Sequence, residues 1–253
     1  MLSKNQISFI QSLNQKKIRK EEGLFIAEGE KIVNDLLESS FTVKKIFAVK
    51  DFSPKKRNRN GEWIEVTEAE LKKISSLTNP NKVLAIAEIP SLEINIEEMN
   101  ESLNIVLDDI SDPGNLGTMI RIADWFGIEN IICSNETADC YNPKVVQASM
   151  GSLFRTKVHY TDLPSFFELH RFNFKIYGTS LTGKNIYSSG LSSNGLIVFG
   201  NESKGVKNEL EKYFTDTLYI PSFNGDTNRS SADSLNVAVA AAIVCGEFRR
   251  RLM

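Results

Sequence analysis

Residues 103–127, LNIVLDDISDPGNLGTMIRIADWFG, are the stretch that decides the fold. It opens with an apolar run, Leu103 to Leu107, whose length is typical of a buried strand. The turn-forming run DDISDPGN follows and places Asn115 where a helix N-cap belongs. Apolar residues then recur at helical spacing as far as Gly127, where the helix is expected to stop. The stretch therefore predicts a strand, a sharp turn and a helix, an arrangement whose strand ends and loops commonly carry the chemistry of α/β proteins.

The segments after this stretch continue the alternation of strands and helices. Strands are predicted at 130–134, 157–160, 175–181, 195–200 and 217–222, and helices at 143–155 and 234–253. Such alternation predicts an α/β fold with a mostly parallel sheet. The last helix is rich in Ala and Val nearly all round, which indicates that it is buried.

The segment before this stretch predicts a second, smaller α/β unit. A helix is expected within residues 1–20, strands near 24–26, 43–50, 62–67 and 82–90, and a helix at 67–77. Thr67, with Glu70 three residues later, is typical of a capping box at the start of that helix. Residues 90–102 are polar and acidic around a proline, which is typical of a linker. The expected domains are therefore 1–95 and 101–253.

Composition and length place the chain among soluble globular proteins. Its 253 residues, 41% hydrophobic and 25% charged, can form one large or two ordinary domains. No apolar run reaches the length of a membrane span, and residues 1–20 lack the apolar core of a signal peptide, so we expect a cytoplasmic protein without membrane contact. The three cysteines and two histidines show no zinc-type spacing, so no metal site is expected.

Positive charge is concentrated in the first 60 residues. They hold 13 lysines and arginines against 7 acidic residues, although the whole chain carries a net charge of −2. Such a basic segment suits contact with the phosphates of a nucleic acid, and the competing interpretation is an ordinary solvated surface. The candidate RNA-binding residues are Lys16, Lys17, Arg19, Lys20, Lys55, Lys56, Arg57 and Arg59.

Three stretches together resemble the signature motifs of the SpoU (TrmH-like) branch of the SPOUT RNA methyltransferases, in the same order and with similar spacing. They are DPGNLGTMIRIADWFG at 112–127, IVFGNESKGV at 197–206, and IPSFNG at 220–225 followed by SLNVAVAAAI at 234–243. The resemblance implies a trefoil-knotted parallel-sheet domain, S-adenosylmethionine as methyl donor, a homodimer, and methylation of a ribose 2′-hydroxyl of RNA. FIAEGEKIV at 25–33 resembles the L30e-like substrate-binding domain of the same family, an RNA platform. This extra domain favours ribosomal RNA as the substrate.

The resemblance also implies the site. Because the methyl donor is already activated, no metal is needed, and the enzyme must align the hydroxyl and help to remove its proton. The family casts its arginine, here Arg121, as base or activator. We favour electrostatic stabilisation, since a guanidinium stays charged. The implied catalytic residues are Asn115, Arg121, Glu202, Ser234 and Asn236. The expected donor-binding residues are Thr179, Gly200, Ile220 and Leu235.

Simpler interpretations and departures from the family pattern accompany these assignments. Glu202 also suits a carboxylate at a helix N-terminus, and Ser234 suits an N-cap. The segment 224–233 is longer than usual, and Ala238 stands where the family has a serine.

The alternative functions are a transfer-RNA 2′-O-methyltransferase and a catalytically silent RNA-binding assembly factor. The intact Arg121, Glu202 and Asn236 argue against the silent protein.

Overall fold

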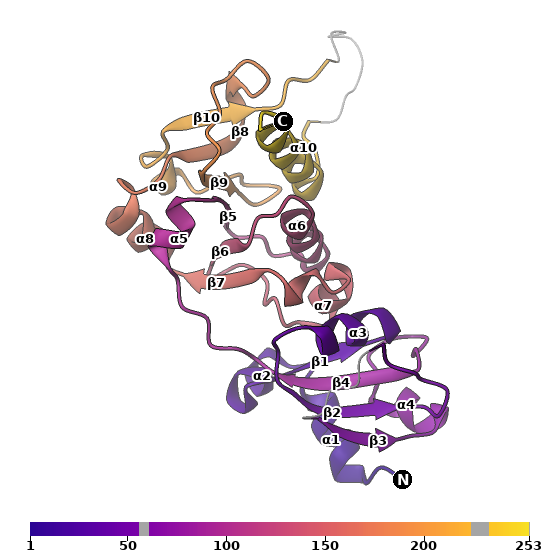
Figure 1. Cartoon of the computed structure of the whole chain (residues 1–253). Helices are drawn as coiled ribbons and strands as arrows, with labels where there is room; N and C mark the ends of the chain where they lie inside the picture. The colour runs from indigo at the N-terminus through magenta and orange to yellow at the C-terminus, as the bar shows by residue number, and fades with distance from the viewer. Residues whose placement is uncertain (56–60, 224–232, 253) are drawn as a thin grey trace. The chain divides into compact units, whose positions relative to one another are not determined.

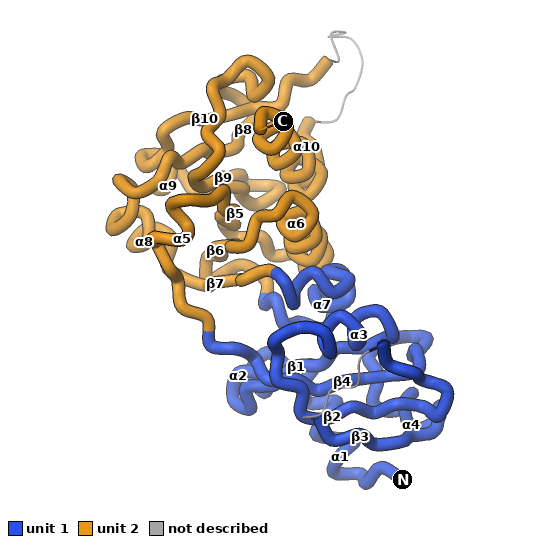
Figure 2. Tube along the Cα trace, viewed as in Figure 1, with its two compact units in different colours: residues 1–91, 139–155 blue, residues 92–138, 156–253 orange. Residues whose placement is uncertain are grey.

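The computed structural model describes residues 1–55, 61–223 and 233–252, which form two compact units (Figure 2). Unit 1 contains residues 1–91 and 139–155, and unit 2 contains residues 92–138 and 156–253. The end of unit 1 at residue 91 lies close to the expected boundary near 95. Segment 139–155 was expected in the second domain, but its contacts place it in unit 1.

Unit 1 is built on a four-stranded sheet with the strand order β1-β4-β2-β3 (Figure 1). Strand β4 runs antiparallel to both β1 and β2, whereas β2 and β3 are parallel. One apolar core joins α1 and α4 to this sheet through buried Ile10, Phe47 and Leu71. The elements are α1 (Lys4–Ser12), α2 (Lys16–Glu22), β1 (Leu24–Glu28), α3 (Glu30–Glu38), β2 (Val43–Ala48), β3 (Glu62–Glu65), α4 (Glu68–Ile74), β4 (Val83–Glu88), α7 (Pro143–Ser149) and the short 3-10 helix η1 (Ser152–Phe154).

The N-terminal helices show one difference from the expectation and one agreement. The helix expected within residues 1–20 is two helices, α1 and α2, separated by a short turn. The capping box is confirmed: Thr67 accepts a hydrogen bond from the Glu70 main chain, and the Glu70 carboxylate accepts one from the Thr67 main chain at 3.0 Å. These bonds satisfy two amides that the first turn of α4 leaves unpaired.

Segment 139–155 joins unit 1 through a buried ion pair and aromatic packing. The Arg19 side chain is 1% exposed, and its Nε and Nη2 donate to Asp139 Oδ2 at 3.0 and 2.5 Å. The ring of Tyr141 lies 4.8 Å from that of the fully buried Phe25 on β1. Gln147 on α7 donates to the carbonyl of Glu28. These contacts explain why the segment belongs to unit 1.

Unit 2 is built on a six-stranded sheet, ordered β10-β8-β9-β5-β6-β7, in which every described pair is parallel. Helices α5, α8 and α9 lie on one face, and α6 and α10 lie side by side on the other (Figure 1). The α/β fold class and its parallel sheet are confirmed, whereas the threading of a trefoil knot stays a prediction. The elements are α5 (Ile96–Asn100), β5 (Leu103–Leu107), α6 (Pro113–Trp125), β6 (Asn130–Ser134), β7 (Lys157–Thr161), α8 (Leu163–His170), β8 (Ile176–Asn185), β9 (Gly195–Phe199), α9 (Asn208–Glu211), β10 (Asp216–Tyr219) and α10 (Val237–Arg250).

The deciding stretch folds as expected, except for its helix cap. Strand β5 has the predicted bounds and is buried throughout. Helix α6 begins three residues earlier than expected because Pro113, with its fixed φ, occupies the first turn. Asp112 is therefore the N-cap and accepts a hydrogen bond from the Asn115 main chain at 2.8 Å. The side chain of Asn115 is consequently left free to make other contacts.

The C-terminal helix begins later than the sequence predicts. Helix α10 starts at Val237, and the side chain of Asn236 caps it by accepting from the main chain of Ala238 and Val239. Ser234 lies before the helix and is not its N-cap. At the other end, Arg249 donates to the carbonyls of Phe126 and Gly127, joining α10 to the end of α6. Within the described residues, no helix is long and apolar enough to cross a membrane.

Candidate active site

The sheet of unit 2 brings several candidate residues to one edge. In a parallel sheet all carboxyl ends lie together, and the loops that follow them form the usual ligand crevice. Strand β9 leads into Gly200, and β10 leads into Ile220. The ladder between β8 and β9 ends at Gly178, whereas β8 stays paired with β10 as far as Asn185. The strands therefore part beside Thr179, whose hydroxyl donates to the Val198 carbonyl at 2.8 Å.

Three side chains from the three motifs form a continuous hydrogen-bonded chain in unit 2. Asn115 on α6 donates through Nδ2 to the carboxylate of Glu202, which lies in the loop after β9. Asn236 donates through Nδ2 to Asn115 Oδ1 at 3.0 Å. Asn236 Oδ1 in turn accepts from the amides of Ala238 and Val239 at 3.0 and 3.3 Å. The structure thus joins Asn115, Glu202 and Asn236, as the resemblance implies.

The direction of this chain follows from its two ends. The amides at the start of α10 can only donate, so the oxygen of Asn236 must face them. Its nitrogen then faces Asn115, whose oxygen accepts, and the nitrogen of Asn115 is left to donate to Glu202. The carboxylate of Glu202 accepts this bond and forms the acceptor end of the hydrogen-bonded chain. The amides of α10 at one end and the carboxylate of Glu202 at the other therefore fix the orientation of both side-chain amides.

A second cluster holds the end of β5 against the loop after β9. Asp108 is fully buried, and its Oδ2 accepts from the main chain of Lys207 at 2.8 Å. The ammonium of Lys207 lies 3.5 Å from Asp108 Oδ1 and 3.2 Å from Glu136 Oε2. Burial alone would lower the pKa of Lys207, but its hydrogen bonds to these two carboxylates raise it overall. Sequence reasoning missed this cluster because its members lie far apart along the chain.

Arg121 lies on a different face of α6 from Asn115. Six residues separate them, which places Arg121 about 120° around the helix from Asn115. Arg121 is exposed, and within the described residues it has no hydrogen bond or ion pair. Ser234 and Leu235 are exposed ahead of α10, and Leu235 is 48% exposed. The structure therefore does not join these three residues to the hydrogen-bonded chain.

The basic candidates of unit 1 divide into three groups. Lys16, Lys17 and Lys20 are exposed on α2, as an RNA-binding surface requires. Lys55 is also exposed, and its main chain donates to Asn34 at 2.9 Å. The prediction that Arg19 binds RNA is wrong, because its side chain is buried and paired with Asp139. The three remaining candidates lie outside the described residues: Lys56, Arg57 and Arg59.

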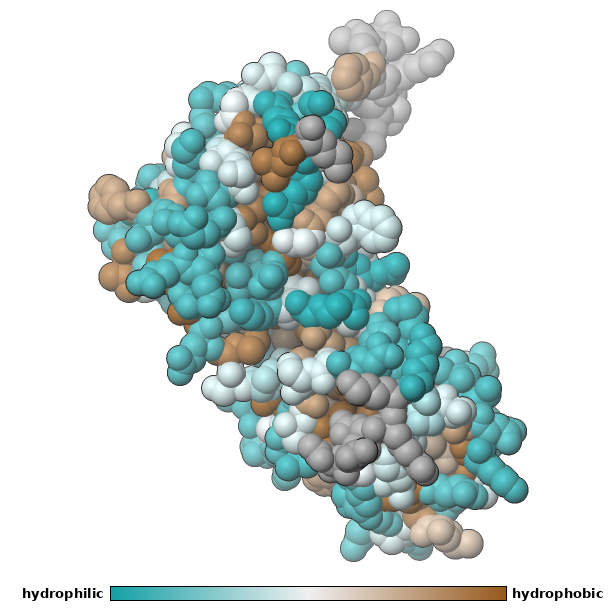
Figure 3. All heavy atoms as spheres, in the orientation of Figure 1, coloured by the Kyte–Doolittle hydropathy of each residue, from teal (hydrophilic) through white to brown (hydrophobic). Residues whose placement is uncertain are grey.

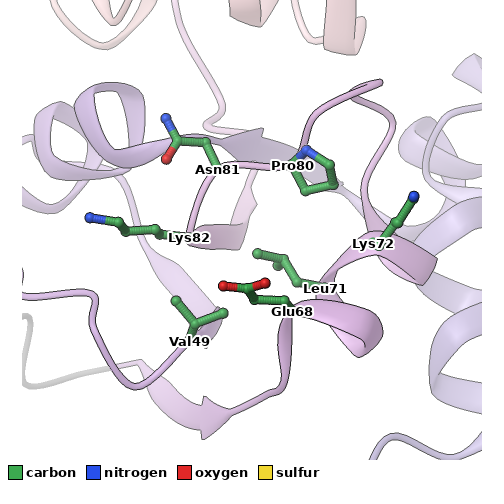
Figure 4. A pocket seen from close by; sticks show the side chains of 7 residues that line it. All are labelled: Val49, Glu68, Leu71, Lys72, Pro80, Asn81 and Lys82. Carbon is green, nitrogen blue, oxygen red and sulfur yellow. The ribbon is translucent and has the colours of Figure 1, made fainter.

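Unit 1 also has a small hollow of about 210 Å³ beside α4 and the start of β4 (Figure 4). The carboxylate of Glu68 lies in it, near Leu71 and Val49, whereas the amino groups of Lys72 and Lys82 point away. It lies in a different unit from the chain formed by Asn115, Glu202 and Asn236 and contains none of the motif residues. Across the described residues, no group of three or more histidines, cysteines and carboxylates could hold a metal ion.

Comparison with known proteins places both parts of the chain. Residues 102–246 match the SpoU rRNA methylase family, and residues 4–85 match the MRM3-like substrate-binding domain. The chain is 33% identical to the 23S rRNA (guanosine(2553)-2'-O)-methyltransferase RlmP of Bacillus subtilis, over 98% of this chain and 97% of that protein.

Solved structures agree over nearly the full length. A TrmH-family protein from Porphyromonas gingivalis superposes with a TM-score of 0.88 at 35% identity, covering 99% of each chain. An AdoMet-bound rRNA methyltransferase from Sinorhizobium meliloti superposes with a TM-score of 0.86 at 30% identity, covering 100% of this chain and 98% of that one. With the three motifs meeting in unit 2, these matches lead to one conclusion: the chain belongs to the SpoU rRNA methylase family and carries an MRM3-like substrate-binding domain.

Proposed function

We propose that the protein transfers a methyl group from S-adenosylmethionine to a ribose 2′-hydroxyl of ribosomal RNA. The observation that carries this proposal is the hydrogen-bonded chain of Asn115, Glu202 and Asn236, one residue from each motif. The relative in Bacillus subtilis is named for 2'-O-methylation of 23S rRNA, and the relative from Sinorhizobium meliloti is an rRNA methyltransferase solved with AdoMet. A cytoplasmic location is part of this proposal, because the relative in Bacillus subtilis acts on bacterial ribosomal RNA.

The residues where β8 and β9 part suit the methyl donor. Thr179, Gly200 and Ile220 offer main-chain groups and one hydroxyl, and no charged side chain among them would oppose a sulfonium. When bound, S-adenosylmethionine supplies an already activated methyl group, so the protein needs to orient the hydroxyl and stabilise its negative charge. Glu202 and Asn115 lie in the loop and helix beside these strand ends, where they would orient the ribose.

Arg121 is proposed as the cation that binds the target phosphate and stabilises the developing alkoxide. A guanidinium stays charged at neutral pH and presents a planar set of donors to phosphate oxygens. Asn115 and Asn236 each already use a side-chain N–H within the hydrogen-bonded chain, whereas Arg121 makes no hydrogen bond or ion pair among the described residues, so its donors are available. Its exposure without a partner among the described residues agrees with a group that meets its ligand only in the complex.

The protein is further proposed to act as a homodimer that covers the exposed face of α6 and α10. Trp125, one helical turn after Arg121, is 83% exposed, and Val239 on α10 is 49% exposed. Apolar surface also gathers over this part of unit 2 (Figure 3). A second copy would bury this apolar surface and place Arg121 within an enclosed interface. Light scattering at micromolar concentration should give a dimer, and a monomer would refute this part of the proposal.

The exposed lysines of unit 1 are proposed to contact the RNA backbone. Replacing Lys16, Lys17 and Lys20 together by alanine should weaken RNA binding and flatten its salt dependence, because fewer counterions are released. Lys44 and Lys45, which pair with Glu88 and Glu62, provide a matched control on the same unit. An unchanged salt slope in the α2 variant would assign that surface to ordinary solvation.

The enzymatic proposal is tested by methyl transfer in vitro. The purified protein is incubated with S-adenosylmethionine carrying a labelled methyl group, and with ribosomal RNA or transfer RNA from cells that lack the gene. The expected product is a 2′-O-methylated ribose at a defined site of ribosomal RNA. If only transfer RNA is labelled, the substrate is transfer RNA and not ribosomal RNA. Donor binding without transfer to either RNA would favour the silent RNA-binding protein.

A further inference from the structure

We propose that Asn201 is the positioning residue of Glu202, holding the loop after β9 against the end of β5. This inference rests on the proposed function, because it gives Glu202 a place in the methyl-transfer site. Asn201 precedes Glu202 directly, and its side chain makes three hydrogen bonds of its own. Asn201 lies within the second motif, but it is not among the catalytic or donor-binding residues that the resemblance implies.

The first function of Asn201 is to shape the turn that carries Glu202. Its Oδ1 accepts from the main chain of Ser203 at 3.0 Å and from that of Lys204 at 3.2 Å. Its own carbonyl accepts from Gly205 at 2.8 Å, which closes the loop. Glu202 thus lies in a turn in which three successive main-chain amides, those of Ser203, Lys204 and Gly205, all donate to Asn201. An exposed glutamate in such a turn is confined without itself being buried.

The second function of Asn201 is to attach this turn to the segment between β5 and the first motif. Its Nδ2 donates to the carbonyl of Asp109 at 2.9 Å. Asp109 has a left-handed backbone, with φ of 55°, and its main chain donates to the hydroxyl of Ser134 at 3.0 Å. Such a conformation is uncommon for a residue other than glycine and points the carbonyl toward the loop only while neighbouring bonds hold it. The bond from Asp109 to Ser134, which does not involve Asn201, therefore helps to hold this anchor in place.

These two functions determine where the carboxylate of Glu202 is located. Because the carboxylate accepts from Asn115, a displaced loop would break this bond and separate Glu202 from the pair formed by Asn115 and Asn236. A displacement of about 1 Å is enough to reduce turnover by roughly 100-fold when reacting groups must be aligned. Asn201 touches neither the donor nor the ribose in this scheme, so it acts only through Glu202.

The experiment compares variants of the full-length protein. Asn201→Ala removes all three bonds, whereas Asn201→Asp keeps both acceptor bonds of the turn and removes the donor to Asp109. The matched control is Asn95→Ala, because Asn95 accepts from the main chain two and three residues later, as Asn201 does, but caps α5. The measurements are single-turnover methyl transfer, donor affinity, melting temperature, and hydrogen exchange of the Gly205 amide.

We expect turnover to fall roughly 10- to 100-fold in both Asn201 variants, with donor affinity within about twofold of wild type. Exchange of the Gly205 amide should become faster in both, and Asn95→Ala should change neither. In a Glu202→Gln background, Asn201→Ala should lower turnover by less than about threefold, because coupled residues are not additive.

Three outcomes would overturn the inference: full turnover in Asn201→Asp, an undiminished effect of Asn201→Ala in the Glu202→Gln background, or unchanged exchange of the Gly205 amide. A wild-type protein that transfers no methyl group would instead refute the proposed function. In that case hydrogen exchange would still decide whether Asn201 holds the loop.

Discussion

Replacing Gly200 by alanine should open the loop that carries Glu202. A Cβ at position 200 would lie 2.2 Å from the carbonyl carbon of Gly205 and 2.2 Å from the nitrogen of Val206. Ordinary contact begins near 3.4 Å, so the two arms of the loop would have to separate by about 1.2 Å. Because both obstructing atoms belong to the backbone, no change of rotamer relieves the overlap. The bond from the Gly205 amide to the Asn201 carbonyl, now 2.8 Å, would stretch to about 4 Å and break.

The expected losses of stability and of methyl transfer follow from this displacement of the loop. Overpacking costs about 1–3 kcal/mol, and the lost hydrogen bond costs about 1 kcal/mol more, so the melting temperature should fall by roughly 5–15 °C. A loop displaced by about 1 Å should also lower methyl transfer by roughly 100-fold. Donor affinity should fall as well, because Gly200 is a proposed donor-binding residue.

Two other glycines supply the controls for this prediction. Gly190→Ala meets no atom within 4 Å and should match wild type. Gly205→Ala also has open space, but its φ of +71° should cost about 1 kcal/mol of backbone strain without separating the arms. Melting curves and single-turnover methyl transfer on all three variants test whether the overlap at position 200 causes the losses. A Gly200→Ala protein no more impaired than Gly205→Ala would refute the crowding argument.

Three further predictions concern other parts of the chain. Arg19→Ala should lower the free energy of unfolding by about 3–5 kcal/mol in denaturant titrations, because it leaves Asp139 without its buried partner, whereas Lys20→Ala should have little effect. Arg121→Ala should keep the melting temperature and lower turnover at least about 100-fold, and Arg121→Lys should not restore it. Hydrogen bonds from main-chain amides, the Thr67 amide first, lower the pKa of Glu70 from 4.5 to about 2. The stabilisation by Glu70 should therefore be complete above pH 4.5, and the difference in melting temperature from Glu70→Gln should vanish as the pH falls toward 2.

Local sequence patterns predicted the elements whose signals are themselves local. The apolar run of β5 and the capping box of Thr67 and Glu70 both appear where expected, since each depends on residues within a few positions. The caps of α6 and α10 were misplaced by two or three residues. Several residues near each helix start can cap it: Asp112 rather than Asn115 accepts the capping bond of α6, and Asn236 rather than Ser234 caps α10. Only the folded geometry decides between such neighbours.

The sequence could not distinguish a buried cation from an exposed one. Arg19 lies among Lys16, Lys17 and Lys20, and the four read as one basic patch. Its partner, Asp139, is 120 residues away and lies in a segment that the motifs assign to the second domain. No local pattern carries that information, because the pairing depends on 139–155 packing on unit 1. Charge counts alone therefore overestimate the number of basic side chains that can contact RNA whenever one of them is buried in an ion pair.

The site itself depends on strand order more than on any one motif. The first motif follows β5 and the second follows β9, and about ninety residues separate them along the chain, yet β5 and β9 are neighbours in the sheet. Parallel pairing of these two strands brings both loops to the same edge, so Asn115 can reach Glu202. The third motif arrives on a helix, because α10 packs beside α6 and presents its N-cap, Asn236, to Asn115. A substitution that weakens the pairing of β5 and β9 should therefore separate Asn115 from Glu202 even though all three motifs remain intact.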